Sequence, residues 1–215
     1  MSKFEKKYWD DNYSDAKSMD GIGNAKDHAN YLKSFFELEM TDISSIVDLG
    51  FGYGYLFQKM MKAFIPYKAM GIEPSRYAFQ KARTRKLRPV ESTKLNLENI
   101  DLKTWCKKED SKKLSFDLGI CTSVFQYIDS KDLDFIIEVL SKRTKYLYLT
   151  VPTDIELKRQ VEELNFDDKY AISRSRKFYR KKLEKHFTNI SSKLWESKYY
   201  FNEENSNFTD LLYRS

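Results

Sequence analysis

Three glycines and two carboxylates have the residue types and the spacing of a ligand site. Asp48 stands just before Gly50, Gly52 and Gly54, and Glu73 ends a second short apolar run further along. Glycine adopts positive φ angles and lets a ligand approach the backbone closely. A carboxylate at the tip of a strand can accept hydrogen bonds from both hydroxyls of a ribose. These residues predict a site for a ligand that contains a nucleoside.

Apolar runs and helical periodicity indicate the elements that position these residues. The run at residues 46–49 predicts a strand, and residues 55–64 repeat apolar side chains at helical spacing. Residues 69–75 contain a second short run, and residues 76–85 predict a second helix. A strand, a glycine loop and a helix begin a βαβ unit, and the unpaired N–H groups of the helix start face the loop.

The glycine spacing separates two classes of cofactor site. The dinucleotide fingerprint G-x-G-x-x-G has its third glycine at the sixth position, where this chain has Tyr55. Its G-x-G-x-G loop instead resembles motif I of the class I S-adenosylmethionine-dependent methyltransferases. The resemblance implies that Asp48 holds the methionine amino end and that the glycine backbone packs against the cofactor. The alternative is a tight turn that needs glycine for structural reasons alone.

The sequence Gly71-Ile-Glu73-Pro74-Ser75 resembles motif II of the same family. The resemblance implies that Glu73 binds the ribose hydroxyls and that Pro74 lies beside the cofactor. The alternative is a solvated strand-end carboxylate, or one that caps the next helix. A third strand is expected at residues 89–95. The family would then place Asn96 near the adenine amino group and Leu97 against the ring.

The second strong match begins with a predicted strand at residues 116–121 and continues to Ile128. The resemblance places Cys121 and Thr122 beside the cofactor and Ser123 beside the acceptor. Tyr127 occupies a position where the family often has histidine, and we expect it to orient the acceptor. The alternative is that Tyr127 starts the following helix and packs under it. The chain lacks the (D/N)-P-P-(Y/F) tetrapeptide of the enzymes that methylate nucleic-acid amino groups here.

An aromatic-rich segment precedes the first strand. Tyr8 and Trp9 resemble the aromatic pair near the start of many small-molecule methyltransferases, and Tyr13 follows them. We expect this segment to form a lid over cofactor and substrate; the alternative is that its aromatics pack on the outside of the sheet. A helix is expected at residues 28–39, with its inward side formed by Tyr31, Phe35 and Leu38.

The remaining pattern predicts helices, strands and one charged surface segment. Helices are expected at 131–141, 154–164 and 174–185, strands at 146–152, 194–201 and 208–213, and the surface segment at 102–113. The predicted fold class is α/β. It is a Rossmann-like doubly wound sheet of about seven strands, mostly parallel with an antiparallel C-terminal strand, plus an N-terminal helical segment. We expect one domain over residues 1–215. It would comprise a lid (1–45), a cofactor-binding core (46–152), and C-terminal helices and closing strands (153–215).

Composition narrows the class of protein. Hydrophobic residues make up 41% of the 215 residues, which is enough for a folded core. No apolar run reaches membrane-spanning length, and we expect neither a signal peptide nor a membrane partner. Cys106 and Cys121 lack metal-ligand spacing, so we expect no metal and a reduced, cytoplasmic setting. The formal net charge of +6 permits an acidic partner. The basic helix at 174–185 would contact phosphates or form a solvated face.

The sequence therefore predicts a methyltransferase that uses S-adenosyl-L-methionine and releases S-adenosyl-L-homocysteine. The expected acceptor is an oxygen, nitrogen or carbon atom of a small molecule. The alternatives are a protein or RNA acceptor, or a non-catalytic partner subunit that binds the cofactor. A nicotinamide-dependent oxidoreductase is disfavoured by Tyr55, and the Y-x-x-x-K runs at Tyr13 and Tyr127 do not follow the strand that this chemistry needs. Neither a phosphate-binding G-K-(S/T) nor a nucleophile elbow is present.

Overall fold

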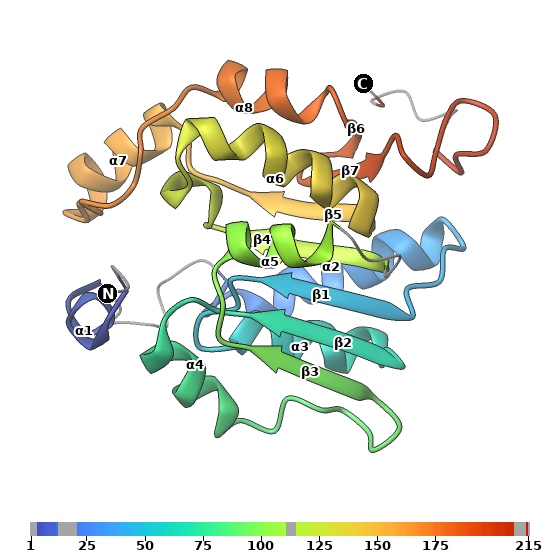
Figure 1. Ribbon diagram of the computed structural model, residues 1–215, viewed down its shortest axis with the longest axis horizontal. Helices are drawn as coiled ribbons and strands as arrows, with labels where there is room; N and C mark the ends of the chain where they lie inside the picture. The colour runs from blue at the N-terminus through green and yellow to red at the C-terminus, as the bar shows by residue number, and fades with distance from the viewer. Residues whose placement is uncertain (1–3, 13–20, 111–114, 209–213, 215) are drawn as a thin grey trace. The chain divides into compact units, whose positions relative to one another are not determined.

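A computed structural model describes residues 4–12, 21–110, 115–208 and 214 (Figure 1). The chain divides into two compact units, Met1–Trp105 and Cys106–Ser215, which are described in turn. Its described residues form seven strands, mostly parallel with antiparallel C-terminal strands, and helices flank them. This architecture confirms the predicted fold class. The division into one domain with three segments stays a prediction.

Three parallel strands form the sheet of the first unit, in the order β3-β2-β1. They are β1 (Ser45–Leu49), β2 (Lys68–Ile72) and β3 (Lys94–Glu98). Leu49 pairs with Ile72, and Ile72 pairs with Glu98, so the three strands end at the same level. The residues that follow them therefore gather at the carboxyl edge, where open α/β sheets bind ligands.

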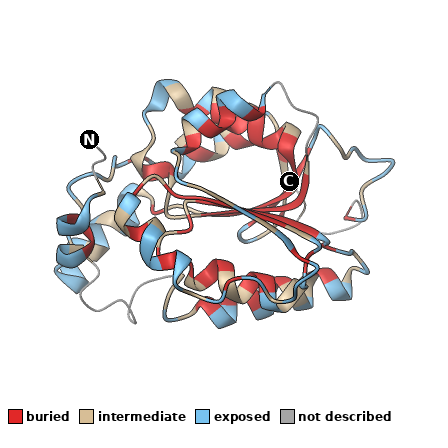
Figure 2. Cartoon of the chain, turned by 60° about the horizontal axis from the view of Figure 1, so that its bottom comes forward, coloured by how far each residue is buried: buried red, intermediate tan, exposed pale blue. Residues whose placement is uncertain are grey.

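Helices of this unit bury apolar faces beside the strands, which are themselves mostly buried (Figure 2). They are α1 (Lys6–Asn12), α2 (Ala25–Leu38), α3 (Tyr55–Phe64) and α4 (Arg76–Arg83), and α5 (Leu102–Glu109) follows β3. The inward face predicted for the first long helix is wrong, because Tyr31 and Leu38 are exposed. The helix starts earlier than expected and buries a different stripe at helical spacing, which consists of Ala25, His28, Ala29, Leu32 and Phe36.

The third strand also differs from the prediction. Residues 89–93 form turns and bends, and the ladder begins where the Lys94 N–H donates to the Tyr67 carbonyl at 2.7 Å. Pro89 has no N–H to donate, which disfavours a strand start there. Asn96 and Leu97 consequently lie inside β3 and not in the loop that follows it. The segment 102–113 is likewise no surface segment at its start, because α5 buries Trp105 completely.

The second unit has four strands in the order β4-β5-β7-β6. β4 (Phe116–Thr122) and β5 (Thr144–Thr150) are parallel, whereas β7 (Leu194–Ser197) and β6 (Phe187–Ser191) are antiparallel to their neighbours. The prediction that residues 194–201 pair with residues 208–213 is therefore wrong, because the partner of β7 on that side is β6. The pair is a hairpin that starts at Phe187, and residues 209–213 lie outside the described residues.

The helices of this unit match their predicted positions closely. They are α6 (Ser130–Arg143), α7 (Asp154–Leu164) and α8 (Arg176–Leu183), and a short 3-10 turn η2 (Phe125–Tyr127) precedes α6. α6 buries apolar residues at helical spacing, among them Leu133, Ile136, Ile137 and Leu140. Within the described parts of the chain, no helix combines the length and apolar character needed to cross a membrane.

Candidate cofactor and acceptor sites

The loop between β1 and α3 requires its three glycines. Gly50, Gly52 and Gly54 have φ angles of 95°, 55° and 77°, a region that L side chains adopt with strain. Gly54 also has no room for a side chain, because an added Cβ would lie 3.3 Å from Cβ of Ala82 in α4. The N–H groups of Gly50 and Phe51 donate to the Ile72 carbonyl, which ties the loop to the end of β2.

Glu73 holds the glycine loop from the end of β2. One carboxylate oxygen accepts the Gly52 N–H, and the other accepts the Ser75 N–H, each at 2.8 Å. The side chain is buried. A carboxylate has about four acceptor sites, so each oxygen keeps a lone pair for a further donor. The arrangement supplies a fixed pair of acceptors for a diol beside the loop.

Asp48 and Glu73 are two buried carboxyl groups of the first unit that interact electrostatically. Burial raises the pKa of Glu73 to about 7, although the two backbone donors lower it. Burial also raises the pKa of Asp48 well above its usual range, and the negative charge of Glu73 raises it further. Two carboxyl groups that are poorly solvated and repel each other favour a ligand with positive charge or hydrogen-bond donors.

Helix α1 packs on the glycine loop. The Trp9 ring lies 3.2 Å from the position that a Gly52 Cβ would occupy, and its centroid is 4.6 Å from that of Tyr53. The Trp9 indole N–H donates to the Ser75 hydroxyl at 2.9 Å, with the Phe4 carbonyl at 3.1 Å. Tyr8 and Trp9 therefore join the loop in a buried aromatic cluster. Tyr13 lies outside the described residues.

Asn99 is a site residue that the sequence reasoning missed. Its side-chain amide donates to the carbonyls of Glu73 and Pro74, at 2.7 and 3.2 Å, and thereby braces the segment that carries the carboxylate. Asn96 is exposed and donates to the Glu98 carboxylate at 3.1 Å, and Leu97 is partly buried. Their contact with adenine stays a prediction. The signal for Asn99 was its place directly after the strand, which the misplaced third strand concealed.

In the second unit, Cys121, Thr122 and Ser123 come at the end of β4. Cys121 is buried, Thr122 pairs with Thr150 of β5, and the Ser123 N–H donates to the Thr150 carbonyl at 2.9 Å. Ser123 has a φ of 54°, which is uncommon for a residue with a side chain. Backbone strain of this kind gathers at functional sites, so Ser123 remains a candidate for acceptor contact.

Tyr127 belongs to η2 and precedes α6, so it does not start that helix. Its hydroxyl donates to the Asp168 carboxylate at 2.5 Å. The neighbouring Gln126 carbonyl accepts the Ile172 N–H at 2.8 Å. The segment between α7 and α8 therefore lies against η2. The Tyr127 hydroxyl, which was expected to orient the acceptor, already donates its hydrogen bond to the Asp168 carboxylate.

Arg174 fastens the same two segments and was also missed as a site residue. The buried guanidinium donates to the carbonyls of Phe125 and Ile128 at 3.1 and 2.6 Å, and to the Ser130 hydroxyl at 3.1 Å. Nothing in the sequence distinguishes this arginine from the other cations of the basic stretch, because its role depends on the folded position of η2. In the described parts of the chain, no three His, Cys, Asp or Glu side chains lie together in a way that could hold a metal ion.

Comparisons with known proteins agree on one family. Residues 46–145 match the family model of a methyltransferase domain. No curated protein matches the chain in sequence. An S-adenosylmethionine-dependent methyltransferase from Clostridium acetobutylicum is 14% identical with a TM-score of 0.64, and the alignment covers 88% of this chain and 96% of that one.

Two further solved structures have bound S-adenosylhomocysteine. The magnesium protoporphyrin IX methyltransferase from Synechocystis is 15% identical over 89% of this chain and 96% of that one, with a TM-score of 0.57. The plantazolicin methyltransferase BpumL is 17% identical over 81% of this chain and 68% of that one, with a TM-score of 0.63. These likenesses establish the fold, and the cofactor of the family is S-adenosylmethionine. The chain therefore has the fold of solved S-adenosylmethionine-dependent methyltransferases, and residues 46–145 match the model of a methyltransferase domain.

Proposed function

We propose that this protein transfers the methyl group of S-adenosylmethionine to an oxygen, nitrogen or carbon atom of a small-molecule acceptor. The observation that carries the proposal is the Glu73 carboxylate, hydrogen-bonded to Gly52 in a loop whose glycines all have positive φ. When bound, the cofactor supplies an electrophilic methyl group on its positively charged sulfonium. The protein contributes binding and orientation.

The residues of the first unit suit this cofactor. The free lone pairs of Glu73 would accept the ribose hydroxyls, and Asp48 would hold the positively charged amino end. The backbone of the loop would pack against the ligand, because Gly52 has no Cβ to intervene. Asn99 keeps Glu73 in place from the end of β3.

Contacts within the second unit hold the region of the proposed acceptor site in place. The segment between α7 and α8 is fastened to η2 through the side chains of Asp168 and Arg174 and the backbone N–H of Ile172. A tyrosine phenol with a pKa near 10 is a poor base at neutral pH. We therefore assign Tyr127 an orienting role, which it would exert through its ring and through Asp168.

The experiment is a transfer assay with isotopically labelled S-adenosylmethionine and a panel of carboxylates, phenols, amines and thiols. We expect S-adenosylhomocysteine and one labelled product to form in equal amounts, and Glu73→Gln to reduce both. Glu91→Gln, which changes an exposed glutamate in the same unit, is the control. Product formation that is equal in wild type and Glu73→Gln would refute the assigned site.

An RNA or protein acceptor is the second candidate, favoured by the concentration of cations at residues 174–185. It would be adopted if macromolecules from the assay, and no small molecule, carried the label. A non-catalytic cofactor-binding subunit would bind S-adenosylmethionine and transfer nothing to any acceptor. A nicotinamide enzyme has no support, because Tyr55 fills the third glycine position of that fingerprint and stacks on the Arg85 guanidinium at 3.6 Å.

A further inference from the structure

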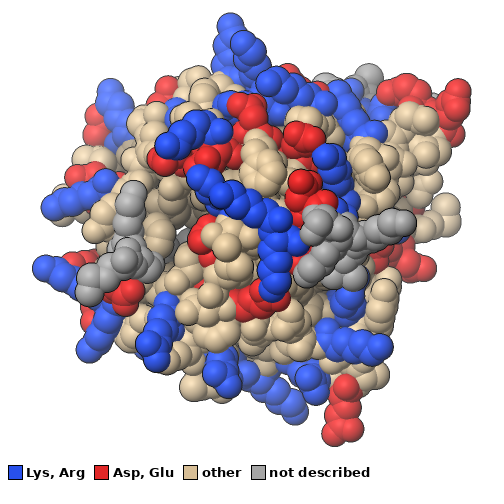
Figure 3. All heavy atoms as spheres, in the orientation of Figure 1, with Lys and Arg blue, Asp and Glu red and all other residues tan. Residues whose placement is uncertain are grey.

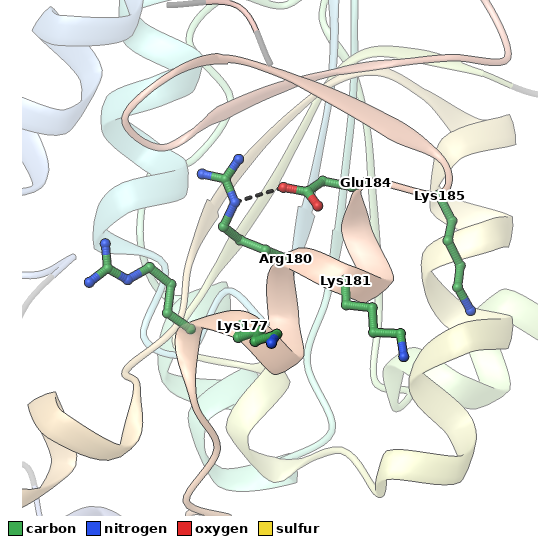
Figure 4. Close-up of a pocket in the computed structure, with 6 residues that line it drawn as sticks. Lys177, Arg180, Lys181, Glu184 and Lys185 are labelled. Carbon is green, nitrogen blue, oxygen red and sulfur yellow. Dashed lines mark hydrogen bonds and ion pairs between the residues drawn. The ribbon is translucent and has the colours of Figure 1, made fainter.

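We propose that the outer face of α8 binds the phosphate backbone of a nucleic acid. The α8 basic surface consists of Arg176, Lys177, Arg180, Lys181 and Lys185, which line a hollow of about 640 Å³ together with Glu184. Figure 4 shows the side chains of Lys177, Arg180 and Lys181 on α8 and that of Lys185 just beyond the end of the helix. In Figure 3, Lys and Arg side chains crowd the top of the view, where Figure 1 places α8.

The charge of the chain is concentrated here. Residues 174–185 contain seven lysines and arginines and one acidic residue, Glu184. This stretch of twelve residues therefore carries a net charge of +6, which equals the formal net charge of the whole chain. The other residues balance to zero, so the positive field of the protein originates at this segment.

Internal ion pairs neutralise only part of the segment. Arg180 pairs with Glu184 at 2.7 Å, and Lys182 pairs with Asp134, from which Lys185 is 3.5 Å away. Arg174 is buried and serves η2. Within the described part of the chain, Arg176, Lys177 and Lys181 have no acidic partner, and all three are exposed. Contacts within the described residues therefore do not neutralise these three charges.

The helix tolerates repulsion to keep this pattern. Lys177 and Lys181 are four residues apart on α8 and lie about 6 Å apart along its axis, and Lys185 follows in the turn after the helix. Like charges four residues apart destabilise a helix. The opposite side of α8 buries Tyr179 and Leu183, so Lys177 and Lys181 face away from the core of the unit. A bound polyanion would offset their repulsion.

Nucleic acid fits this surface better than other polyanions. Interfaces with proteins are depleted in lysine and have an apolar centre, whereas every residue that lines this hollow is charged. A helix that lies on a membrane inserts an apolar face, but the apolar side of α8 is buried in its own unit. Interfaces with nucleic acids are polar and strongly positive, because they neutralise phosphates.

The test is fluorescence anisotropy of a labelled single-stranded RNA with the full chain, without cofactor, across about 50–200 mM salt. We expect log K to fall linearly with log salt, by about 0.7 for each phosphate contact. The double variant Lys177→Gln/Lys181→Gln should bind about tenfold more weakly and flatten the slope by about 1.4, the value for two lost contacts. The matched control is Lys26→Gln/Lys62→Gln, which removes two exposed lysines from α2 and α3; it should bind as wild type does.

Each contrary outcome overturns the inference. Equal weakening by both double variants would show that net charge alone attracts the RNA. Wild-type protein that binds polyglutamate or anionic vesicles more tightly than RNA would assign the surface to an acidic protein or to a membrane. Melting temperatures within error of wild type would show that both variants fold. Since binding is measured without cofactor, this test does not depend on the proposed methyl transfer.

Discussion

At the level of single residues, Glu73 is the proposed acceptor for the ribose hydroxyls. Its pKa is raised to about 7, so ligand-free protein holds a proton on this carboxyl at lower pH. Hydroxyl donors favour the ionised form, so ligand binding releases that proton. S-adenosylhomocysteine should therefore bind up to about tenfold more tightly at pH 8 than at pH 6. Calorimetry across this range should show the dependence in wild type and a flat profile in Glu73→Gln.

The raised pKa of Glu73 also predicts how the stability of the folded protein changes with pH. Its folded pKa of about 7 exceeds the ordinary value of 4.5. The folded protein therefore holds a proton that the unfolded chain releases between these values. The contribution of Glu73 to stability falls as pH rises through this window. Urea denaturation should show Glu73→Gln gaining stability relative to wild type from pH 5 to pH 7. A constant difference would contradict the raised pKa.

The role of Gly71 in packing became visible only in the three-dimensional structure. A Cβ added there would lie 2.7 Å from the Phe51 ring and 2.9 Å from the Phe57 ring. Gly71→Ala should lower the free energy of unfolding by about 1–3 kcal/mol, the usual effect of overpacking. Gly23→Ala changes an exposed glycine and is the control. Equal stability of the two variants would show that the aromatic rings shift without cost.

At the level of elements, α1 acts as a cover for the glycine loop. The Trp9 indole N–H joins α1 to Ser75, which caps α4. Trp9→Phe keeps a ring but loses this donor, at a cost of about 1 kcal/mol. We expect cofactor to dissociate about fivefold faster in stopped-flow measurements. Trp195→Phe removes an indole of the same 7% exposure from β7, and an equal effect there would exclude a covering role for Trp9.

A second feature at the level of elements is the segment between α7 and α8, which is hydrogen-bonded to η2. Tyr127→Phe removes the hydroxyl that reaches Asp168. It should lower kcat/KM on the order of tenfold and leave cofactor affinity unchanged. Asp168→Asn should have a similar effect, and Tyr199→Phe, at an exposed tyrosine, should have none. Normal kinetics for Tyr127→Phe with the true acceptor would remove the hydroxyl from the mechanism.

Sequence patterns located those elements whose local structure restricts the residue types that can form them. The glycine loop and the apolar runs located β1, α3 and β2, because positive φ and continuous burial restrict residue type strongly. β3 and the C-terminal hairpin were misplaced, since partly exposed strands have weaker patterns. Asn99 was missed because the third strand was misplaced, and Arg174 was missed because its backbone partners belong to a distant segment. No residue type identifies such partners in sequence.

On the scale of the whole molecule, the chain combines a methyltransferase fold with a positive net charge that is concentrated in residues 174–185. The fold agrees with that of solved methyltransferases at 14–17% identity. At that distance the acceptor does not follow from the fold, because one fold hosts many functions. It must be sought through the residues of η2 and α8 themselves.

Calorimetric titration with S-adenosylhomocysteine tests the central claim most directly. We predict one site per chain and no heat with NADH. Glu73→Ala should weaken binding by about 1.5–3 kcal/mol, the scale of hydrogen bonds to a charged group, with the melting temperature of the ligand-free variant confirming its fold. Unchanged affinity in Glu73→Ala, or binding of NADH in place of S-adenosylhomocysteine, would contradict the account.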